Sequence, residues 1–253
     1  PNFRYICTMT DKLTHIDALL AELNRYRANE NYRITEALEI EYTYDSNRIE
    51  GNTLTLNETE LVVNKGITIA GKGMREHLEA INHKEAIDFV KDIVRNNVPV
   101  TESVLKDIHA IVLHSIDKEN AGRYRSVPVI ISGSRHIPPQ PYLLGPMMEE
   151  LFRWYEQNKD TMHPVVLAAN MHEKFVSIHP FIDGNGRTAR LVMNLILIQH
   201  GYPIANIKGD NDTRLRYYQA LEQASSGDNT AFVEFVEDVV TESLEHYLSI
   251  LRG

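Results

Sequence analysis

The chain has 253 residues, of which 43% are hydrophobic and 24% charged, and its formal net charge is −9. A chain of this size and composition can bury one full core, and its negative charge argues against a broad surface for nucleic-acid phosphates. The single cysteine, Cys7, excludes a disulfide framework and a cysteine-based zinc cluster, so we expect a reducing compartment.

No apolar run approaches the roughly 20 residues that cross a bilayer, and the first residues lack the apolar region of a signal peptide. We therefore expect a cytoplasmic protein that binds neither membrane nor nucleic acid.

Helical spacing of apolar residues dominates the chain and predicts an all-α fold. Residues 55–58, Thr-Leu-Asn-Glu, resemble a capping box that opens a short helix. The other predicted helices cover residues 10–27, 35–47, 75–95, a segment after Thr101, 146–157, 164–177, an apolar segment from 191 to about 200, 212–224 and 230–251.

One segment departs from this helical pattern and predicts a short β-hairpin. Residues 127–131 are mostly β-branched, the turn-like Ser132-Gly133-Ser134 follows, and Pro138-Pro139 would keep the second strand short and at an edge. A lid or docking edge and a plain structural hairpin both fit this pattern.

The stretch from His179 to Arg190 carries the chemistry. Gly184-Asn185-Gly186 comes just before a helix start, where free backbone N–H groups favour a phosphate. His179 is a candidate general base, with a buried structural histidine as the alternative. Asp183 beside a phosphate indicates Mg²⁺, although a helix N-cap would also use it.

Two cations follow the glycines, Arg187 and Arg190, three residues apart and hence on one helix face. Cations at a helix N-terminus oppose the helix dipole, so we expect an anion or an internal carboxylate to compensate them. A metalloprotease site is rejected because His172 and His179 lack the spacing of two zinc ligands on one helix, and His172 is predicted to be a buried structural residue.

Residues 179–190, HPFIDGNGRTAR, resemble the active-site motif H-x-F-x-[DE]-G-N-G-R-x-x-R of the Fic (Fido-fold) family. The similarity extends over approximately residues 100–240 and includes Gly122-Arg123-Tyr124-Arg125, the hairpin, and Arg216 to Leu221. This resemblance implies an all-α fold with one hairpin flap and transfer of AMP from ATP to a Ser, Thr or Tyr hydroxyl of a protein, with release of pyrophosphate.

The resemblance also implies residue roles. His179 would deprotonate the target hydroxyl, Asp183 would hold Mg²⁺, and Phe181 would anchor the loop in the core. The flap, residues 129–137, would line the nucleotide and align the target as an added strand. The residues implied in ATP binding are Asp183, Gly184, Asn185, Gly186, Arg187, Thr188, Arg190, Tyr217, Tyr218, Ser225, Ile131, Ser132, Gly133 and Ser134. Ser225 stands where relatives often have Asn.

A second match lies upstream, where Ser46 to Gly51 resembles the family's inhibitory motif [ST]-x-x-x-E-[GN]. Ser46 and Glu50 are four residues apart and share a helix face. The resemblance implies that Glu50 pairs with Arg190 and occupies the group that should hold the γ-phosphate; an ordinary helix end is the alternative.

These inferences predict an autoinhibited protein adenylyltransferase. An N-terminal helical region (1–97) would contain the inhibitory helix (about 35–51), followed by a catalytic core (98–242) and the end of the last helix (243–253). The alternatives are transfer of another phosphate-containing group, removal of AMP, or a nucleotide-sensing or protein-binding module with vestigial activity. The predicted partner is a target protein docked on the flap, with self-modification and a homodimer as further options.

Overall fold

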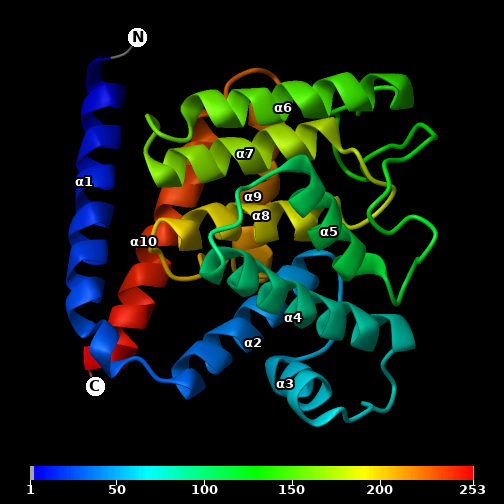
Figure 1. Cartoon of the computed structure of the whole chain (residues 1–253), viewed down its shortest axis with the longest axis horizontal. Coiled ribbons are helices and arrows are strands. Elements are labelled where there is room, and N and C mark those ends of the chain that lie inside the picture. The colour runs from blue at the N-terminus through cyan, green and yellow to red at the C-terminus, as the bar shows by residue number, and fades with distance from the viewer. Residues whose placement is uncertain (1–2, 253) are drawn as a thin grey trace.

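The computed structural model describes residues 3–252, and the side chain of Cys7 lies outside the part it describes. Regular structure in the described residues is entirely helical (Figure 1). The elements in chain order are α1 (Phe3–Tyr26), the 3₁₀ turn η1 (Arg27–Asn29), α2 (Tyr32–Ile49), α3 (Leu56–Lys65), α4 (Met74–Arg95), α5 (Glu102–Leu113), the 3₁₀ turn η2 (Pro141–Leu143), α6 (Leu144–Asn158), α7 (Pro164–Ile178), α8 (Asn185–Gln199), α9 (Asn211–Ala224) and α10 (Thr230–Arg252). The predicted all-α fold is confirmed.

Helix α8 lies at the centre of the molecule. Its residues from Leu191 to Leu197 are all buried, so the helix is apolar on every side and is covered by α2, α4, α5 and α7. A helix that is hydrophobic all round belongs inside a core. Because the candidate motif forms its N-terminus, that motif is fixed to the most deeply buried element of the fold.

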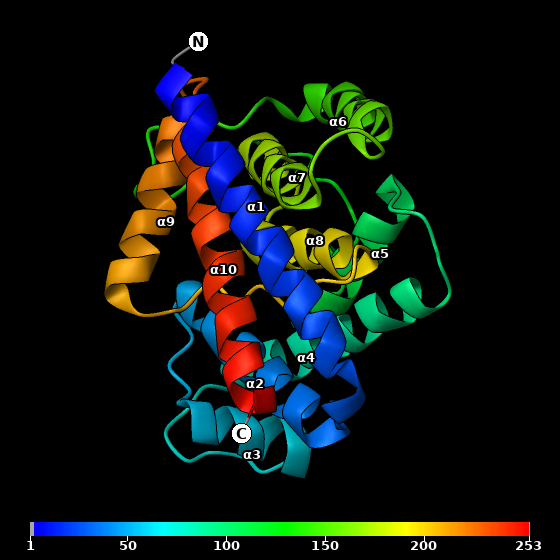
Figure 2. The same cartoon turned by 90° about the vertical axis from the view of Figure 1, so that its left-hand side faces the viewer.

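Helices α1 and α10 form a long pair along one side of this centre, as both views show (Figures 1 and 2). The pair joins the start of the chain to its end, and Ile16 and Leu23 of α1 belong to the same apolar cluster as Leu248 and Leu251 of α10. One continuous core therefore crosses the expected boundary near residue 97.

Helix α2 begins earlier than predicted, because Asn31 caps it instead of Thr35. The Asn31 side chain accepts hydrogen bonds from the N–H groups of Arg33 and Ile34. The helix ends at Ile49, and Gly51 follows with φ of +96°. The predicted capping box of α3 is confirmed, since the Thr55 side chain and the Glu58 carboxylate each bond the other's backbone N–H.

The predicted hairpin is not confirmed. Residues 127–139 include the predicted flap (129–137) and its two ends, and the whole segment is called the flap below. It forms an irregular loop, and no strand is found anywhere in residues 3–252. Pro128 and Pro138 have no N–H to give to a ladder. The carbonyls of Val127 and Pro139, at the two ends of the flap, accept instead from the Arg125 guanidinium. The flap is thus closed at its base by one side chain.

The turn at the tip of the flap is confirmed. The N–H of Ser134 donates to the carbonyl of Ile131 over 3.2 Å, and Gly133 has φ of +80° at the third position of the turn. Positive φ at this position is the reason that a glycine stands there.

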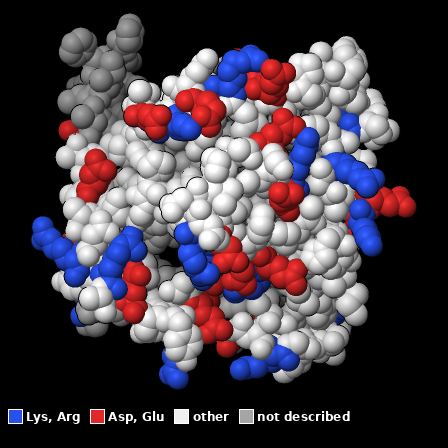
Figure 3. Space-filling model, in the orientation of Figure 1, with Lys and Arg blue, Asp and Glu red and all other residues white. Residues whose placement is uncertain are grey.

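Charges of both signs mix over the face shown in Figure 3. In residues 3–252 no helix combines the length and apolarity needed to cross a membrane.

Candidate functional site

A six-residue loop, residues 179–184, joins α7 to α8 and presents His179 and Asp183. Helix α7 ends at Ile178, and the C-cap residue His179 has a left-handed backbone (φ 50°, ψ 56°). Gly184 is the N-cap of α8, with φ of +77°. A left-handed conformation is costly for a non-glycine residue and persists only where neighbours enforce it. The histidine is therefore held in place by the surrounding structure.

Several contacts enforce this loop from within. The Asn185 side chain both donates to the Phe181 carbonyl (2.9 Å) and accepts from the Phe181 N–H (3.0 Å). Phe181 is fully buried, as predicted, and stacks on the His109 ring with centroids 3.5 Å apart. The amide of Asn185 thus holds the loop, which leaves only its backbone N–H for an anion.

His109 of α5 holds the same loop by a third contact. Its Nδ1 accepts from the Gly122 N–H at 2.9 Å, so the proton lies on Nε2, which donates to the Asp183 carbonyl at 2.9 Å. Burial lowers the pKa of His109 to about 4, so the ring is neutral at pH 7.

Arg125 ties the loop to the flap. Its backbone N–H donates to the Pro180 carbonyl and its Nε to the His179 carbonyl, both at 2.9 Å. The rest of its guanidinium holds the base of the flap through Val127 and Pro139. One buried side chain therefore fixes the position of His179 relative to the flap.

The Glu50 carboxylate lies directly on the glycine turn. A Cβ added to Gly186 would collide with the Glu50 Oε1 atom. The first N–H groups of α8 have no intrahelical acceptor, and the positive end of the helix dipole favours an anion at this point. Glu50 therefore lies against Gly186, next to the turn that the sequence assigned to phosphate oxygens.

Arg190 is fully buried and is the ion-pair partner of the same Glu50 carboxylate. Its Nη2 donates to the Glu50 Oε1 (2.7 Å) and to the Ser46 carbonyl (2.8 Å), and its Nε donates to the Ser46 Oγ (3.0 Å). Its Nη1 points to the Tyr217 hydroxyl at 3.5 Å. The pairing of Glu50 with Arg190 that the resemblance implied is present, and Ser46 of α2 adds two contacts that the sequence did not predict.

Arg187 is also buried, and its surroundings fit a phosphate. Among the described residues, its Nε and Nη1 have no hydrogen-bond acceptor. Its Nη1 lies 3.6 Å from the Glu79 carboxylate and its Nη2 lies 3.3 Å from Asp183. Buried donors without acceptors cost free energy, which a polyphosphate oxygen would recover.

Asp183 is the predicted metal ligand. Burial alone would raise its pKa, but the positive charge of Arg187, the Gly184 N–H and Arg75 together hold it below the ordinary value. Mg²⁺ is typically held by one or two carboxylates plus substrate phosphates, and the described residues contain no cluster of three or more acidic, His or Cys ligands. A single ionised carboxylate beside the glycine turn fits Mg²⁺ brought in with a nucleotide.

His179, which follows α7, is partly buried, whereas His172 within α7 is fully buried. Burial lowers the pKa of His179, and the positive charge of Arg125 acts in the same direction. His172 is completely buried, and burial lowers its pKa to about 3; its Nε2 lies 3.1 Å from the Tyr217 hydroxyl. His172 is therefore a structural residue, as predicted.

Comparison with known proteins agrees with this geometry. Residues 99–197 match the family model described as Fic/DOC family. The chain is 38% identical over 211 residues to "Protein adenylyltransferase Fic" of Nematostella vectensis, an alignment that covers 83% of this chain and 48% of the relative. The chain belongs to the Fic/DOC family.

Further comparisons give one more sequence relative and two solved structures of similar fold. The Drosophila melanogaster protein of the same name is 36% identical over 209 residues, covering 82% of this chain and 42% of the relative. The solved structure of Fic-1 (residues 134–508) from C. elegans has a TM-score of 0.85 at 29% identity and covers 96% of this chain and 72% of that one. A Fic domain containing signaling protein from Bacteroides thetaiotaomicron also has a TM-score of 0.85, at 27% identity, covering 96% and 97%. This Fic chain spans about half the length, or less, of the two named sequence relatives.

The predicted adenosine residues lie along α9 of the Fic chain, but they differ in exposure. Tyr217 is buried and supports Arg190, so it faces the core and not an open surface. Tyr218 is 46% exposed, and its hydroxyl donates to the Ile49 carbonyl. Ser225 caps the end of α9, and its hydroxyl donates to the Glu222 carbonyl. Tyr218 is the tyrosine of this pair that a ligand can reach.

The flap tip meets α9 at Glu222, a contact that the sequence did not predict. The Ser134 hydroxyl donates to Glu222 Oε2 at 2.5 Å, and the Arg135 N–H donates to Oε1 at 2.9 Å. The predicted nucleotide residues of the flap and of α9 are therefore brought to one edge of the site. Thr188, in contrast, is fully buried in α8.

Arg75, Glu79, His109, Arg125 and Glu222 were all missed as contributors to the site. The first four contact the motif from distant parts of the chain, and Glu222 contacts the flap tip. None stands at a diagnostic spacing from the motif. Only Arg125 carried a signal, since it belongs to the Gly122-to-Arg125 match.

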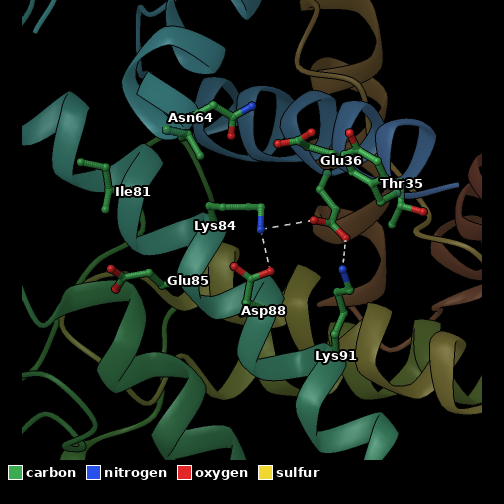
Figure 4. Close-up of a pocket in the computed structure, with 11 residues that line it drawn as sticks. Thr35, Glu36, Asn64, Ile81, Lys84, Glu85, Asp88 and Lys91 are labelled. Atoms are coloured by element: carbon green, nitrogen blue, oxygen red, sulfur yellow. Dashed lines mark hydrogen bonds and ion pairs between the residues drawn. The ribbon is translucent and has the colours of Figure 1, made fainter. Parts of the chain in front are cut away.

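A cavity of about 600 Å³ lies away from the motif, between α2, α3 and α4. Lys84 and Lys91 extend from α4 toward α2 at its wall (Figure 4). Both ammonium groups pair with the buried Glu39 carboxylate of α2, at 3.3 and 2.5 Å, and Lys84 also pairs with Asp88 at 2.6 Å. Both lysines of this cavity are already paired, and the pairs with Glu39 join α4 to α2.

Proposed function

We propose that this chain contains the catalytic part of a protein adenylyltransferase that transfers AMP from ATP to a protein Ser, Thr or Tyr hydroxyl. The main observation behind the proposal is that the Glu50 carboxylate lies against Gly186 and pairs with Arg190. A carboxylate held at an anion site beside a histidine is what an autoinhibited phosphate-transfer centre requires. The names of the sequence relatives support the same activity.

In the proposed reaction, His179 takes the proton of the target hydroxyl while that oxygen bonds to the α-phosphorus. The bond to the bridging oxygen breaks and pyrophosphate leaves. The neutral imidazole required for this step is favoured by the lowered pKa of His179. Mg²⁺, when bound with ATP, would be held by Asp183 and would offset the charge of the phosphates.

The remaining phosphate contacts would come from the helix start and the arginines. The N–H groups of Asn185 and Gly186 would donate to oxygens of the phosphate chain, because the Gly184 N–H already donates to Asp183. Arg187 would use its two unsatisfied buried donors. Arg190 would take the γ-phosphate only after Glu50 leaves. Tyr218, Ser225 and the flap tip, residues 131–134, would border the adenosine.

The flap is the proposed docking edge for a target protein. Ile130 and Ile137 are 90% and 81% exposed, and residues 127–131 have no ladder partner within the described chain. An extended target segment would pair with this free backbone. Self-modification, a homodimer, a cytoplasmic location and the division into residues 1–97, 98–242 and 243–253 remain parts of the proposal.

Incubation with α-phosphate-labelled ATP, Mg²⁺ and a lysate tests the activity. Glu50→Gly should raise protein labelling by about tenfold or more, because displacing a charge-assisted hydrogen bond costs about 1.5–3 kcal/mol and every 1.4 kcal/mol is tenfold in affinity. His179→Ala in that background should lower labelling by about 10²–10⁴-fold. Glu60→Gly, at an exposed position on α3, is the matched control for loss of a glutamate.

The alternatives give different labelling patterns. Label from γ- but not α-phosphate would indicate phosphoryl transfer, and loss of label from a pre-modified target would indicate AMP removal. An absence of turnover in Glu50→Gly despite nucleotide binding would favour a vestigial module.

A further inference from the structure

A second contact from the N-terminal half of the chain reaches the catalytic loop. Arg75, the second residue of α4, donates from Nη2 to the Asp183 Oδ2 atom at 2.5 Å. Its side chain is 60% exposed, whereas Asp183 is 39% exposed, so the guanidinium covers the carboxylate from the solvent side. The contact does not involve Glu50 or Arg190.

Glu79 holds Arg75 in this position. Arg75 Nε donates to Glu79 Oε1 at 3.1 Å, one helical turn along α4. The Glu79 side chain is 13% exposed, and its Oε2 accepts from the Asn52 side chain at 3.1 Å. The Asn47 side chain, from α2, also reaches the Glu79 carbonyl at 3.4 Å. Arg75 is therefore connected through Glu79 to Asn47 and Asn52, which precede and follow Glu50 in the chain.

The Asp183 carboxylate has both oxygens engaged in this arrangement. Oδ1 accepts from the Gly184 N–H at 2.6 Å and lies 3.3 Å from Arg187 Nη2, and Oδ2 is taken by Arg75. A divalent cation bound to Oδ2 would lie beside the Arg75 guanidinium, which is hydrogen-bonded to the same oxygen. Two positive charges this close repel each other strongly. The cation and Arg75 therefore compete for one carboxylate oxygen.

We propose that Arg75 is a second inhibitory residue, which covers the metal-binding carboxylate while Glu50 covers the phosphate-binding arginine. This inference rests on the proposed function, because it assigns Asp183 to Mg²⁺. Binding of a metal–nucleotide complex then requires that two contacts break: that of Glu50 with Arg190 and that of Arg75 with Asp183. Both released groups belong to the segment from α2 to the start of α4.

Manganese binding to the full chain tests the proposal without turnover. Mn²⁺ affinity is measured by electron paramagnetic resonance in the presence of a non-hydrolysable ATP analogue, with Glu50→Gly as the background. Arg75→Ala should tighten the apparent Mn²⁺ dissociation constant by about three- to tenfold, since it removes a competing positive charge. Arg75→Lys, which keeps the charge, should stay nearer to the background value.

Arg95→Ala is the matched control, because Arg95 is an exposed arginine on the same helix that pairs only with a local aspartate, Asp92. It should leave the constant unchanged. An Arg75→Ala constant equal to the background, or weaker than it, would overturn the proposal. Nucleotide binding is measured in parallel. Failure of Glu50→Gly to bind the analogue contradicts the proposed function and this inference together, whereas normal analogue binding with an unchanged Mn²⁺ constant contradicts this inference alone.

Discussion

Arg190 carries its charge at a position with no solvent exposure, and this makes its partners important. A buried cation must be matched by hydrogen-bond acceptors and counter-charge, because leaving it unpaired costs several kcal/mol. Ser46 supplies two acceptors and Glu50 supplies the charge. An incoming γ-phosphate can replace Glu50 in charge, while the Ser46 contacts keep the guanidinium oriented. Under the proposed inhibition by Glu50, Arg190 would therefore stay correctly placed for the proposed reaction.

The protonation of His179 sets the expected pH dependence. Its pKa lies below the ordinary value of 6.5, so the ring is neutral and able to accept a proton at pH 7, and this ability is lost only as the pH falls below 6.5. Initial labelling rates of Glu50→Gly between pH 5 and 8.5 should therefore show an acidic limb with its midpoint below 6.5. A midpoint at pH 7 or above would contradict this assignment.

At the scale of elements, the site depends on how α2 and the flap are attached. Asp45 of α2 accepts from the Gly209 N–H and from the Asn206 side chain, both at 2.8 Å. A Cβ at Gly209 would lie 2.9 Å from the Asp45 carbonyl, so this close approach requires glycine. On its other side, α2 is joined to α4 by Glu39. Helix α2, which carries the proposed inhibitory residues at its end, is therefore held from two sides, and its position depends on the whole fold.

Removing Glu39 tests the attachment of α2 to α4. Glu39→Ala leaves two partly buried lysines without their shared partner, and we expect a loss of about 1–3 kcal/mol in the free energy of unfolding after allowing for their exposure. Looser α2 should also raise basal labelling. Urea unfolding and the labelling assay measure the two effects. Glu36→Ala, at an exposed position of the same helix, should change neither one.

The flap tip should depend on Glu222 in a similar way. Glu222→Ala removes both acceptors that hold Ser134 and Arg135 against α9, and the remaining turn has no ladder to stabilise it. Trypsin should therefore cut after the exposed Arg135 several times faster, because cleavage follows the population of the open form. The same substitution at the neighbouring exposed Gln223 is the control. Equal cleavage rates in both variants would show that Glu222 does not hold the flap.

At the scale of the whole molecule, the α1–α10 pair contains a buried charge. Glu237 of α10 has no solvent exposure, and its carboxylate has no hydrogen-bond donor among the described residues. Burial raises its pKa to about 7; Lys12 of α1 opposes this change, and Glu234 and Asp238 add to it. The folded state therefore favours the protonated form.

This raised pKa predicts a loss of stability with rising pH. The protonated carboxyl is tolerated below pH 4.5, and the cost of keeping Glu237 buried grows as the pH rises through about 7. Glu237→Gln should therefore stabilise the fold by about 1–3 kcal/mol at pH 8, with little effect at pH 5. Urea unfolding at both pH values measures this. A gain at pH 5 that equals the gain at pH 8 would rule out titration as the cause.

Local patterns in the sequence predicted much of the fold and part of the site. Helices α4 to α10 follow the apolar spacing, and Thr55 and Glu58 form the predicted cap, because periodicity and capping depend on residues within a few turns. The two strands of the predicted hairpin do not form in the described residues. The turn at Gly133 is local, but pairing depends on which partner the carbonyls of Val127 and Pro139 find, and Arg125 is that partner.

By itself, the sequence determined that a histidine, a carboxylate, a glycine turn and two arginines belong to one loop before a buried helix, since these residues are contiguous. It also singled out Glu50 as the partner of Arg190, through a resemblance that joined two distant segments. Only the tertiary structure decided that Glu50 lies on Gly186, that Tyr217 supports Arg190 from the core, and that Arg75 covers Asp183. These contacts arise where α2, α4 and α9 pack around α8, and the burial and orientation of the side chains there depend on all of these helices at once.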